Sequence, residues 1–431
     1  MTEVRIASEP HVVHVPGDKS ITHRALIFAA LADGRSRVRN ALIAGDTRST
    51  AVCLRGLGVD VPALNHDCID VVGAGLYGLR APVDPLDCGN SGTSARLLLG
   101  ALAGCPFRTV LTGDASLCSR PMRRVTGPLA EAGATFEELQ GQGRLPIAVH
   151  GGNLGTIVHH APRASAQVKS ALLLAGLTGG TSVHVSEPHR SRDHSERMLA
   201  AMDAPVAVSE RAGRAHVTLD LTRRLNALDI TVPGDFSSAA FFIAYAILAN
   251  RSVRTVGVGV NPTRTGFLDA LLAMGAHVGI EMERLEGGEP VADVIARPSA
   301  LRATNVTAAA VVRLIDEVPV LAVLAARAEG ESRITGAAEL RVKESDRLRA
   351  LATNLRAIGV DAEELGDGLV VQGTDAPLAG RVQCQGDHRI AMAFGILAAL
   401  PGNRIEIDEP DAPTVSFPAF WHELRACSGS S

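Results

Sequence analysis

Six continuously apolar segments, rich in alanine and leucine, recur along the chain at nearly constant spacing. They end at Gly34, Gly104, Gly176, Asn250, Gly330 and Gly402, so that successive ends lie 70 to 80 residues apart. A helix that is apolar on every side is expected to be buried, because none of its faces suits water. The pattern therefore predicts six buried helices, one in each repeat of about 72 residues.

A second series of segments alternates with the first. Each of them is amphipathic, ends at a glycine or an aspartate, and is followed by a short strand-like run. The stops are Gly58, Gly133, Asp203, Gly275 and Gly359, and Leu424–Cys427 resembles a truncated sixth copy. Glycine, and less readily aspartate, adopts the left-handed conformation that ends a helix. Each repeat is therefore expected to hold one buried helix, one surface helix and several short strands.

A short polar motif is also duplicated, as Pro16-Gly-Asp-Lys-Ser20 and Pro233-Gly-Asp-Phe-Ser237, 217 residues apart. This separation is close to three repeats, which favours two domains of three repeats each. Common Leu, Ala and Gly strings could recur by chance, but the two series stay in phase along the whole chain. The predicted parts are a discontinuous domain (1–15 and 236–431), an inserted domain (20–232) and crossings near 16–19 and 233–235.

Polar residues stand at the start of every predicted buried helix. These starts are 18–20, 90–93, 165–167, 235–237, 316–317 and 387–389. Ser, Asn and Asp cap helices, and the unpaired backbone N–H groups of a helix start attract anions. If the repeats direct these starts to one place, that place will favour a polyanion.

Basic residues lie close to the same starts. They are Arg24, Arg96, Arg120, Lys169, Arg192, Arg264, Arg347 and Arg389. Any one of them could form an ordinary surface ion pair. As a set gathered at helix starts, they favour an anionic small-molecule substrate.

Composition narrows the class of protein. The chain has 431 residues, a net charge of −4 and only 3% aromatic residues, which argues against a nucleic-acid partner. The first residues, MTEVRIASEP, lack the apolar core of a signal peptide, and no run reaches the roughly 18 apolar residues of a membrane helix. Seven scattered cysteines without a C-x-x-C pair indicate reduced thiols. We expect a cytoplasmic monomer.

Lysine is rare. Only Lys19, Lys169 and Lys343 are lysines among 42 basic residues. Lysine at a position where arginine is the rule is expected where a compact ammonium group that can transfer a proton is needed. Chance survival of three lysines is the alternative, but each of the three stands in a polar motif.

One stretch imitates a nucleotide-binding motif. Gly73-Ala-Gly75-Leu-Tyr-Gly78 matches G-x-G-x-x-G, but such a site needs a helix immediately afterwards. Pro82 and Pro85 follow instead, so a hairpin or loop is predicted. The histidines show no metal-binding spacing, and neither a metal nor another cofactor is expected.

Several motifs together resemble the EPSP synthase family. They are Pro16–Leu26, Gly89–Arg96, Asp114–Met122, Ser165–Lys169, Ile315–Glu317, Arg341–Leu348 and Asp387–Arg389, which occur in the order of the family between residues 16 and about 420. Arg192-Asp-His-Ser-Glu196 and Asn261-Pro-Thr-Arg264 are similar to the glyphosate-tolerant class II branch. Gly92 replaces the alanine of the best-known tolerant members, and Val415 replaces a lysine of class I.

A related family, the UDP-N-acetylglucosamine enolpyruvyl transferases, has the same fold. Its loop cysteine would fall at Ala115, and its Lys-Asn pair corresponds to Lys19-Ser20 here. Both differences favour EPSP synthase.

The resemblance implies an α/β fold, a two-domain inside-out α/β barrel whose repeats are βαβαββ-type units with buried helices and outer sheets. It also implies transfer of the enolpyruvyl group of phosphoenolpyruvate (PEP) to the 5-hydroxyl of shikimate-3-phosphate. The implied catalytic residues are Asp316, Glu344, Lys343 and Lys19. Shikimate-3-phosphate would contact Lys19, Ser20, Arg24, Ser165, Ala166, Gln167, Arg192, Asp316 and Lys343. PEP would contact Lys19, Gly92, Arg120, Gln167, Arg347 and Arg389.

Some simpler alternatives remain at this point. Asp316 could be only a helix cap, Glu344 could only pair with Arg347, and Arg96, Lys169 and Arg264 could orient neighbours instead of touching substrate. Two functions of other classes also compete with the transferase. One is a non-catalytic anion-binding repeat scaffold, and the other is an oxidoreductase that binds NAD near Gly73.

Overall fold

The computed structural model describes residues 9–429, so the expectation about the first residues lies largely outside the described part. The chain divides into two compact units. The discontinuous unit contains the N-terminal segment up to Pro16, Gly234–Arg284 and Pro290–Ser431. The inserted unit contains Gly17–Pro233 together with the short segment Leu285–Glu289, an excursion that the sequence did not predict.

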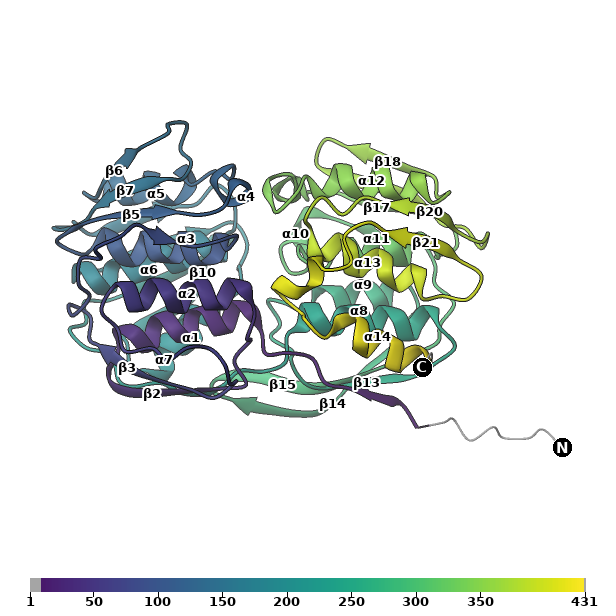
Figure 1. Ribbon diagram of the computed structural model, residues 1–431, viewed down its shortest axis with the longest axis horizontal. Helices are drawn as coiled ribbons and strands as arrows, with labels where there is room; N and C mark the ends of the chain where they lie inside the picture. The colour runs from purple at the N-terminus through teal and green to yellow at the C-terminus, as the bar shows by residue number, and fades with distance from the viewer. Residues whose placement is uncertain (1–8, 430–431) are drawn as a thin grey trace. The chain divides into compact units, whose positions relative to one another are not determined.

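The inserted unit surrounds three buried helices with shorter helices and sheets (Figure 1). The buried helices are α1 (Lys19–Leu31), α3 (Gly92–Ala103) and α6 (Ala166–Gly179). The other helices are α2 (Gly45–Gly56), α4 (Ala115–Cys118), α5 (Arg123–Glu131) and α7 (His194–Ala201). Because an added Cβ at Gly100 of α3 would overlap the backbone of Ala171 in α6, glycine allows these two helices to pack closely.

Three sheets belong to the inserted unit. The first has the order β12-β2-β3 (Asp229–Thr231, Asp33–Arg39 and Ile69–Ala74). The second has the order β4-β5-β7-β6 (Leu86–Asp87, Arg108–Thr112, Ile147–His150 and Thr135–Glu138). The third has the order β10-β11-β9-β8 (Val206–Arg211, Arg214–Leu219, Val183–Glu187 and Ile157–His160). Each sheet mixes parallel and antiparallel pairs.

The discontinuous unit also has three buried helices, α8 (Phe236–Leu248), α11 (Val318–Ala325) and α13 (His388–Ala398). Its other helices are α9 (Gly266–Ala273), α10 (Ala308–Val311), α12 (Arg347–Ala357), α14 (Phe420–Ser428) and the 3₁₀ segments Ala338–Val342 and Ala412–Val415.

Its sheets have the orders β1-β13-β15-β14, β16-β17-β19-β18 and β20-β21. The strands are β1 (His11–Val13), β13 (Val253–Gly259), β14 (His277–Glu286), β15 (Glu289–Arg297), β16 (Asn305–Val306), β17 (Glu331–Ile334), β18 (Ala362–Leu365), β19 (Gly368–Gln372), β20 (Ala379–Val382) and β21 (Arg404–Ile407).

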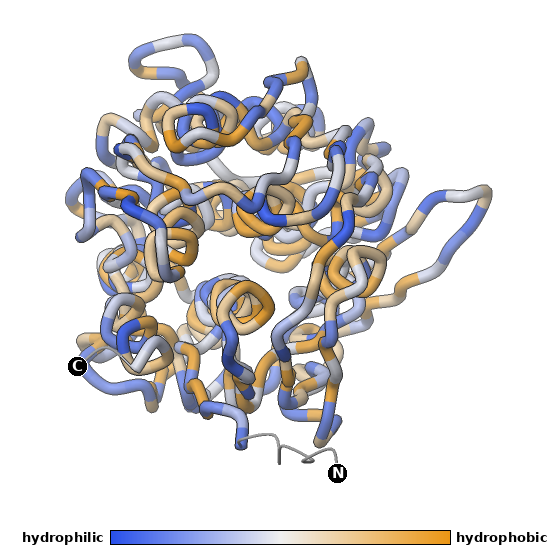
Figure 2. The backbone as a smooth tube through the Cα atoms, turned by 90° about the vertical axis from the view of Figure 1, so that its right-hand side faces the viewer, coloured by the Kyte–Doolittle hydropathy of each residue, from blue (hydrophilic) through white to orange (hydrophobic). Residues whose placement is uncertain are grey.

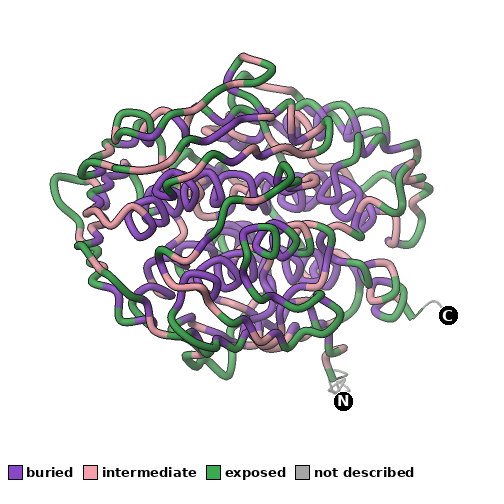
Figure 3. The backbone as a smooth tube through the Cα atoms, turned by 60° about the vertical axis from the view of Figure 1, so that its left-hand side comes forward, coloured by how far each residue is buried: buried purple, intermediate pink, exposed green. Residues whose placement is uncertain are grey.

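The prediction of six buried helices is confirmed. In Figure 3 the buried chain is concentrated in helical coils, while the exposed chain forms loops and strands at the outside. Figure 2 shows the same helices as mostly hydrophobic and many outer loops as hydrophilic. Each unit has its own hydrophobic core, as expected when three all-apolar helices are covered on every side.

The predicted ends of three buried helices are wrong: α11 and α13 end at Ala325 and Ala398, before Gly330 and Gly402, and α6 continues past Gly176. Helix α6 runs through Gly176 to Gly179, and Gly180 then adopts the left-handed conformation at φ 59°. An added Cβ at Gly176 would lie 2.2 Å from the side chain of Val183, so this glycine makes room for β9 instead of ending the helix.

The predicted stops of the amphipathic helices are confirmed. Gly58, Gly133, Asp203, Gly275 and Gly359 have φ between 58° and 116°, two residues after α2, α5, α7, α9 and α12 end. A left-handed residue at this position closes the last turn and releases the chain.

The G-x-G-x-x-G stretch forms a turn, as predicted. Strand β3 ends at Ala74, Gly75 has φ 77°, and the next helix begins only at Gly92. No helix start is therefore available to hold a dinucleotide at this place in the described chain.

Cysteines, membrane-crossing helices and metal sites were considered over all described residues. All seven cysteines lie within residues 9–429 and are free thiols. In the same range, no helix has both the length and the apolarity to cross a membrane. No group of three or more His, Cys, Asp or Glu side chains among the described residues is placed to hold a metal ion.

Candidate active site

Arg24 joins the starts of three helices in the inserted unit. It donates from Nη2 to Ser170 Oγ of α6 and from Nε to Ser195 Oγ of α7, both at 2.9 Å. Its Nη1 also donates to the carbonyl of Ser20, one turn earlier in α1, at 2.9 Å. Burial and the nearby Arg192 lower the pKa of Arg24 to about 10. Two adjacent cations that repel one another are well suited to share a dianion such as a phosphate.

A chain of hydroxyl groups links α1, α2 and α3 behind this cluster. His23 Nδ1 lies 2.7 Å from Thr50 Oγ1, and Thr50 lies 2.6 Å from Ser94 Oγ. Ser94 in turn donates to Ser91, the residue that caps α3, at 2.7 Å. Burial lowers the pKa of His23 to about 3, so the imidazole is neutral and serves as a hydrogen-bonding link.

Gln167 is held by α3. Arg96 Nη1 donates to Gln167 Oε1 at 2.8 Å, and Gln167 Nε2 donates to Thr93 Oγ1 at 3.1 Å. These two bonds fix which side of the amide carries the oxygen. Arg96 therefore orients Gln167, a predicted substrate contact. The sequence had allowed Arg96 either to orient a neighbour or to touch substrate.

Gly92 opens α3 beside two guanidinium groups. A Cβ added at Gly92 would lie 3.1 Å from Arg96 Nη1 and 3.3 Å from Arg120 Nη1. Arg120 also donates to Asn90 Oδ1 at 2.7 Å and to Ser116 Oγ at 3.1 Å. The structure thus brings together Gly92 and Arg120, which were predicted as PEP contacts, and a larger residue at 92 would push against the ends of two arginine side chains.

The lysines of the inserted unit differ. Lys19 Nζ lies 3.1 Å from Asp46 Oδ2, and both side chains are partly exposed. Asp46 is the second residue of the surface helix α2 and belongs to no motif, so no pattern in the sequence pointed to it. Lys169 is buried, with Nζ 2.8 Å from Glu196 Oε1 and 3.3 Å from Glu187 Oε2.

Lys169 is consequently an internal ion-pair residue. Burial opposes its charged form, but the carboxylates of Glu196 and Glu187 outweigh burial and raise the pKa of the ammonium group. The side chain is only 1% exposed, which favours the orienting role among the two that the sequence allowed.

In the discontinuous unit, cations surround the carboxylate of Asp316. Lys343 Nζ lies 3.4 Å and Arg347 Nη1 3.6 Å from Asp316 Oδ1, while Arg264 Nη1 lies 3.9 Å from Oδ2. Arg389 donates to the backbone carbonyl of Asp316 at 3.1 Å. Asp316 precedes Glu317, the N-cap residue of α11, so the helix-cap alternative for Asp316 is wrong.

Arg347 forms the shortest ion pairs of this cluster. Its Nε lies 2.8 Å from Asp387 Oδ2 and its Nη2 2.7 Å from Glu344 Oε2. Burial acts against its charge, but Asp387 and Glu344 outweigh burial and raise the pKa of Arg347 further. Glu344 therefore does pair with Arg347, and the pair places Glu344 next to Lys343 and Asp316.

Arg264 is buried deeper, behind Asp316. It donates to Ser237 Oγ at 2.8 Å and lies 3.7 Å from Glu317 Oε1. Arg264 is therefore held by the starts of α8 and α11, which favours an orienting role.

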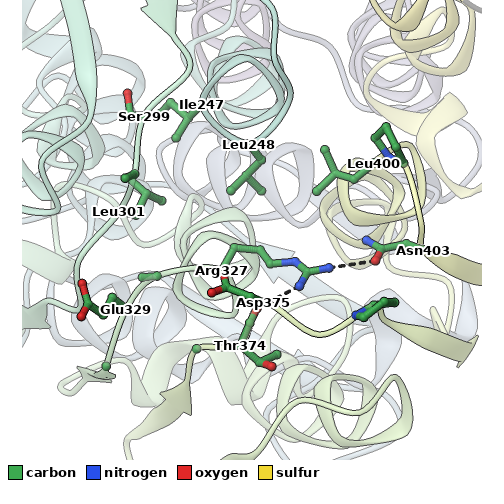
Figure 4. Close-up of a pocket in the computed structure, with 16 residues that line it drawn as sticks. Ile247, Leu248, Ser299, Leu301, Arg327, Glu329, Thr374, Asp375, Leu400 and Asn403 are labelled. Atoms are coloured by element: carbon green, nitrogen blue, oxygen red, sulfur yellow. Dashed lines mark hydrogen bonds between the residues drawn. The ribbon is translucent and has the colours of Figure 1, made fainter.

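A separate cavity of about 740 Å³ lies at the other end of these helices (Figure 4). Leu248 at the end of α8 and Leu400 after α13 line it, and Arg327 donates to Asn403 Oδ1 at its wall. None of the predicted site residues lines this cavity, so it is distinct from the cluster around Asp316.

The chain shares its fold with a distantly related protein of known structure. Its structure is similar to that of the enolpyruvyl transferase NikO from Streptomyces tendae, with a TM-score of 0.74, 18% identity and coverage of 98% and 96% of the two chains. At this identity the likeness concerns the fold alone.

The chain belongs to the EPSP synthase (3-phosphoshikimate 1-carboxyvinyltransferase) family, whose model matches residues 8–424. It is 48% identical to the 3-phosphoshikimate 1-carboxyvinyltransferase of Desulforamulus reducens, with 96% of each protein covered. The corresponding protein of Thermosynechococcus vestitus is 49% identical, with 96% and 94% covered. The EPSP synthase structure from Acinetobacter baumannii has a TM-score of 0.81, 39% identity and 97% and 96% coverage.

The chain is therefore an enzyme of the shikimate pathway that transfers the enolpyruvyl group of PEP to shikimate-3-phosphate. The UDP-N-acetylglucosamine transferase, the anion-binding scaffold and the NAD-dependent oxidoreductase are set aside. The mixed α/β fold expected from the resemblance is confirmed at this level.

Proposed function

We propose that both units supply residues to the reaction, with different duties. In the inserted unit, shikimate-3-phosphate is bound by Lys19, Ser20, Arg24, Ser165, Ala166, Gln167 and Arg192. PEP is bound by Lys19, Gly92, Arg120 and Gln167 of the inserted unit and by Arg347 and Arg389 of the discontinuous unit. Two phosphates and two carboxylates require this many donors, and arginine offers a planar fork that matches them.

The observation that supports the chemistry is the group around Asp316. The ammonium group of Lys343 pairs with the carboxylate of Asp316. Arg347 pairs with both Asp316 and the second carboxylate, that of Glu344. Such a group can accept one proton and deliver another, which the addition of a hydroxyl group across a carbon–carbon double bond requires.

The addition step follows from these positions. Asp316 accepts the proton of the 5-hydroxyl of shikimate-3-phosphate while the hydroxyl oxygen forms a bond to C2 of PEP. Glu344 or Lys343 delivers a proton to C3, which produces a tetrahedral intermediate with a methyl group. Lys19 acts beside the reacting groups as a further proton carrier and cation.

In the elimination step, the bond between C2 and the phosphate oxygen breaks. The methyl group returns a proton to the residue that supplied it, the double bond re-forms, and phosphate leaves. Arg120, Arg347 and Arg389 stabilise the negative charge of the departing phosphate.

Substitution of Glu344 by glutamine tests this assignment. Glu344→Gln keeps the shape of the side chain and its contact with Arg347, but the amide cannot exchange a proton. We expect phosphate release to slow by roughly 10²–10⁴, with binding of shikimate-3-phosphate retained. Turnover close to that of the wild type would remove Glu344 from the chemistry.

We further propose that the enzyme works as a cytoplasmic monomer, with three repeats in each barrel-like domain. The proposed cytoplasmic location is supported by seven free thiols and by the absence of a membrane-crossing helix among residues 9–429. The proposal of three repeats in each domain is supported by the recurrence of one buried helix and one helix that ends at a left-handed glycine or aspartate. A mass of 44.9 kDa in solution is the expected result of light scattering.

A further inference from the structure

Two separate segments of the inserted unit share one buried carboxylate. Glu187, at the end of β9, accepts a hydrogen bond from the backbone N–H of Ser165 at 2.8 Å through Oε1. Its Oε2 accepts a bond from the hydroxyl of Ser191 at 2.6 Å and from the backbone N–H of Ser191 at 3.3 Å. The side chain of Glu187 is 3% exposed, so these are bonds in a low-dielectric interior.

Both segments, 165–167 and the one that contains Arg192, are assigned above to the binding of shikimate-3-phosphate. Ser165 opens α6 and is followed by Ala166 and Gln167, and Ser191 directly precedes Arg192. Ser165 also differs from Asp18 and Ser91, whose side chains cap their helices, because its side chain makes no capping hydrogen bond. The backbone of Ser165 is thus fixed by Glu187, while its hydroxyl is not used by the helix.

Lys169 forms a buried ion pair with Glu187. Its ammonium group lies 3.3 Å from Glu187 Oε2 and donates to the carbonyl of Ser191 at 3.3 Å. Because Lys169 lies one helical turn after Ser165, it anchors the first turn of α6 to the same carboxylate. Glu196, at 2.8 Å from Lys169, completes the buried group.

We propose that Glu187 is a positioning residue for shikimate-3-phosphate: its carboxylate, held by Lys169, sets the spacing between the 165–167 segment and Arg192. Glu187 does not touch the substrate. It acts through the two segments, in the way that carboxylates behind metal ligands or catalytic histidines fix the groups in front of them. The proposal rests on the binding roles assigned to Ser165 and Arg192 above.

The test compares the Michaelis constants of the two substrates. Glu187→Gln replaces an acceptor-only carboxylate with an amide whose NH₂ group cannot accept from Ser165 or Ser191. The KM for shikimate-3-phosphate should rise roughly 10- to 100-fold, the usual worth of hydrogen bonds to a charged group. The KM for PEP should change less than about 3-fold, because Gln167, the PEP contact in this segment, is held separately by Arg96 and Thr93 of α3. A purely structural role would not separate the two substrates. Equal changes in both constants, or none, would overturn the proposal.

Glu138→Gln is the matched control. Glu138, on β6 of the same unit, also accepts from a backbone N–H, that of Gly143 at 2.7 Å, and also pairs with a cation, Arg123 at 3.1 Å. Neither of these partners is assigned to a substrate, so both KM values should stay within about 2-fold of the wild type.

A milder variant decides the matter if Glu187→Gln does not fold. Ser191→Ala removes one hydroxyl bond to Glu187, and the KM for shikimate-3-phosphate should rise roughly 3- to 10-fold. If the KM for shikimate-3-phosphate is unchanged in Ser191→Ala, the proposal is overturned.

Arg192→Met separates this inference from the assignment on which it rests. If Arg192→Met leaves the KM for shikimate-3-phosphate unchanged, the binding role of the segment is wrong. If Arg192→Met raises that KM and neither Glu187→Gln nor Ser191→Ala does, only the positioning role of Glu187 is wrong.

Discussion

The two units are built on the same plan of three buried helices but hold their arginines in different ways. In the inserted unit, Arg24 donates to serine hydroxyls and Arg120 to an amide and a hydroxyl. In the discontinuous unit, Arg347 is bound by Asp387 and Glu344. Neutral partners leave the positive charge of an arginine for a ligand, whereas carboxylates compensate it. This difference supports the proposal that the inserted unit mainly binds anions and that the discontinuous unit carries the proton transfer, besides holding PEP through Arg347 and Arg389.

The cores of the units differ as well. The discontinuous unit packs Phe236 against Phe267, and Phe242 against Phe417 and Phe420. The core of the inserted unit contains a single fully buried phenylalanine, Phe28, and is otherwise built from aliphatic side chains and cysteines. Helices in the inserted unit can therefore approach closely at positions such as Gly100, while the aromatic rings fill wider spaces in the other unit.

The largest effect is expected at the carboxylate in the cluster of the discontinuous unit. Asp316→Asn removes the group that accepts the hydroxyl proton but keeps its size. The kcat should fall by roughly 10²–10⁴, with binding of shikimate-3-phosphate largely retained. Asp269→Asn is the control, because Asp269 is exposed and pairs with Arg313 at 2.7 Å. If Asp316→Asn weakened binding without slowing turnover, the division of duties between the units would be wrong.

The second prediction concerns stability. Asp387 and Arg347 form a buried pair at 2.8 Å, so Asp387→Ala removes the buried carboxylate partner of Arg347 and leaves it with Glu344 and Asp316 alone among its ion-pair partners described above. Urea unfolding should show a loss of about 3–5 kcal/mol, and substitution of an exposed partner such as Asp269 a loss below about 1 kcal/mol. Similar losses in the two variants would mean that the buried pair contributes no more than a surface pair.

The same pair predicts a dependence on pH. Burial acts to raise the pKa of Asp387, but Arg347 outweighs burial and the net pKa is lowered. A carboxylate with a lowered folded-state pKa stabilises the protein above its unfolded value of about 4, and this contribution disappears as the pH falls through the folded pKa. The unfolding free energy should therefore decline below about pH 4, and less steeply in Asp387→Asn. Parallel profiles would assign the acid sensitivity to other carboxylates.

A smaller effect is expected at Arg24. Arg24→Lys keeps a positive charge but replaces a guanidinium whose Nε, Nη1 and Nη2 donate to three different groups with one compact ammonium group. The KM for shikimate-3-phosphate should rise about 10-fold, and the KM for PEP should change little. Arg37→Lys is a suitable control, because Arg37 forms an exposed pair with Asp70 in the same unit. An unchanged KM would show that charge alone suffices at position 24.

The smallest effect is expected at Gly92. In Gly92→Ala the new methyl group lies 3.1–3.3 Å from Arg96 and Arg120, which must move by a few tenths of an ångström. The KM for PEP should rise about 3- to 10-fold with little change for shikimate-3-phosphate, and inhibition by glyphosate should weaken. Gly127→Ala, where an added Cβ meets nothing within 4 Å, is the control. Equal effects of the two substitutions would separate Gly92 from the PEP contacts.

Much of the fold followed from local patterns. All-apolar segments have to be buried wherever they lie, and a glycine or aspartate stop acts within one turn of its own helix, so Gly58 and Asp203 could be placed from the sequence. Gly176 could not be placed in this way, because its role depends on Val183, which belongs to a strand. The excursion of Leu285–Glu289 into the inserted unit likewise left no local signal.

The sequence by itself determined the elements, the caps and the motif residues of the site, because these depend on neighbours within a few positions along the chain. Only the tertiary structure decided which partner each charge has. Three carboxylates show this, because 22 to 40 residues of chain separate each of them from a partner. They are Asp46 beside Lys19, Glu187 beside Ser165 and Asp387 beside Arg347. Electrostatic pairing depends on distance in space and on burial, and both are set by the packing of the helices.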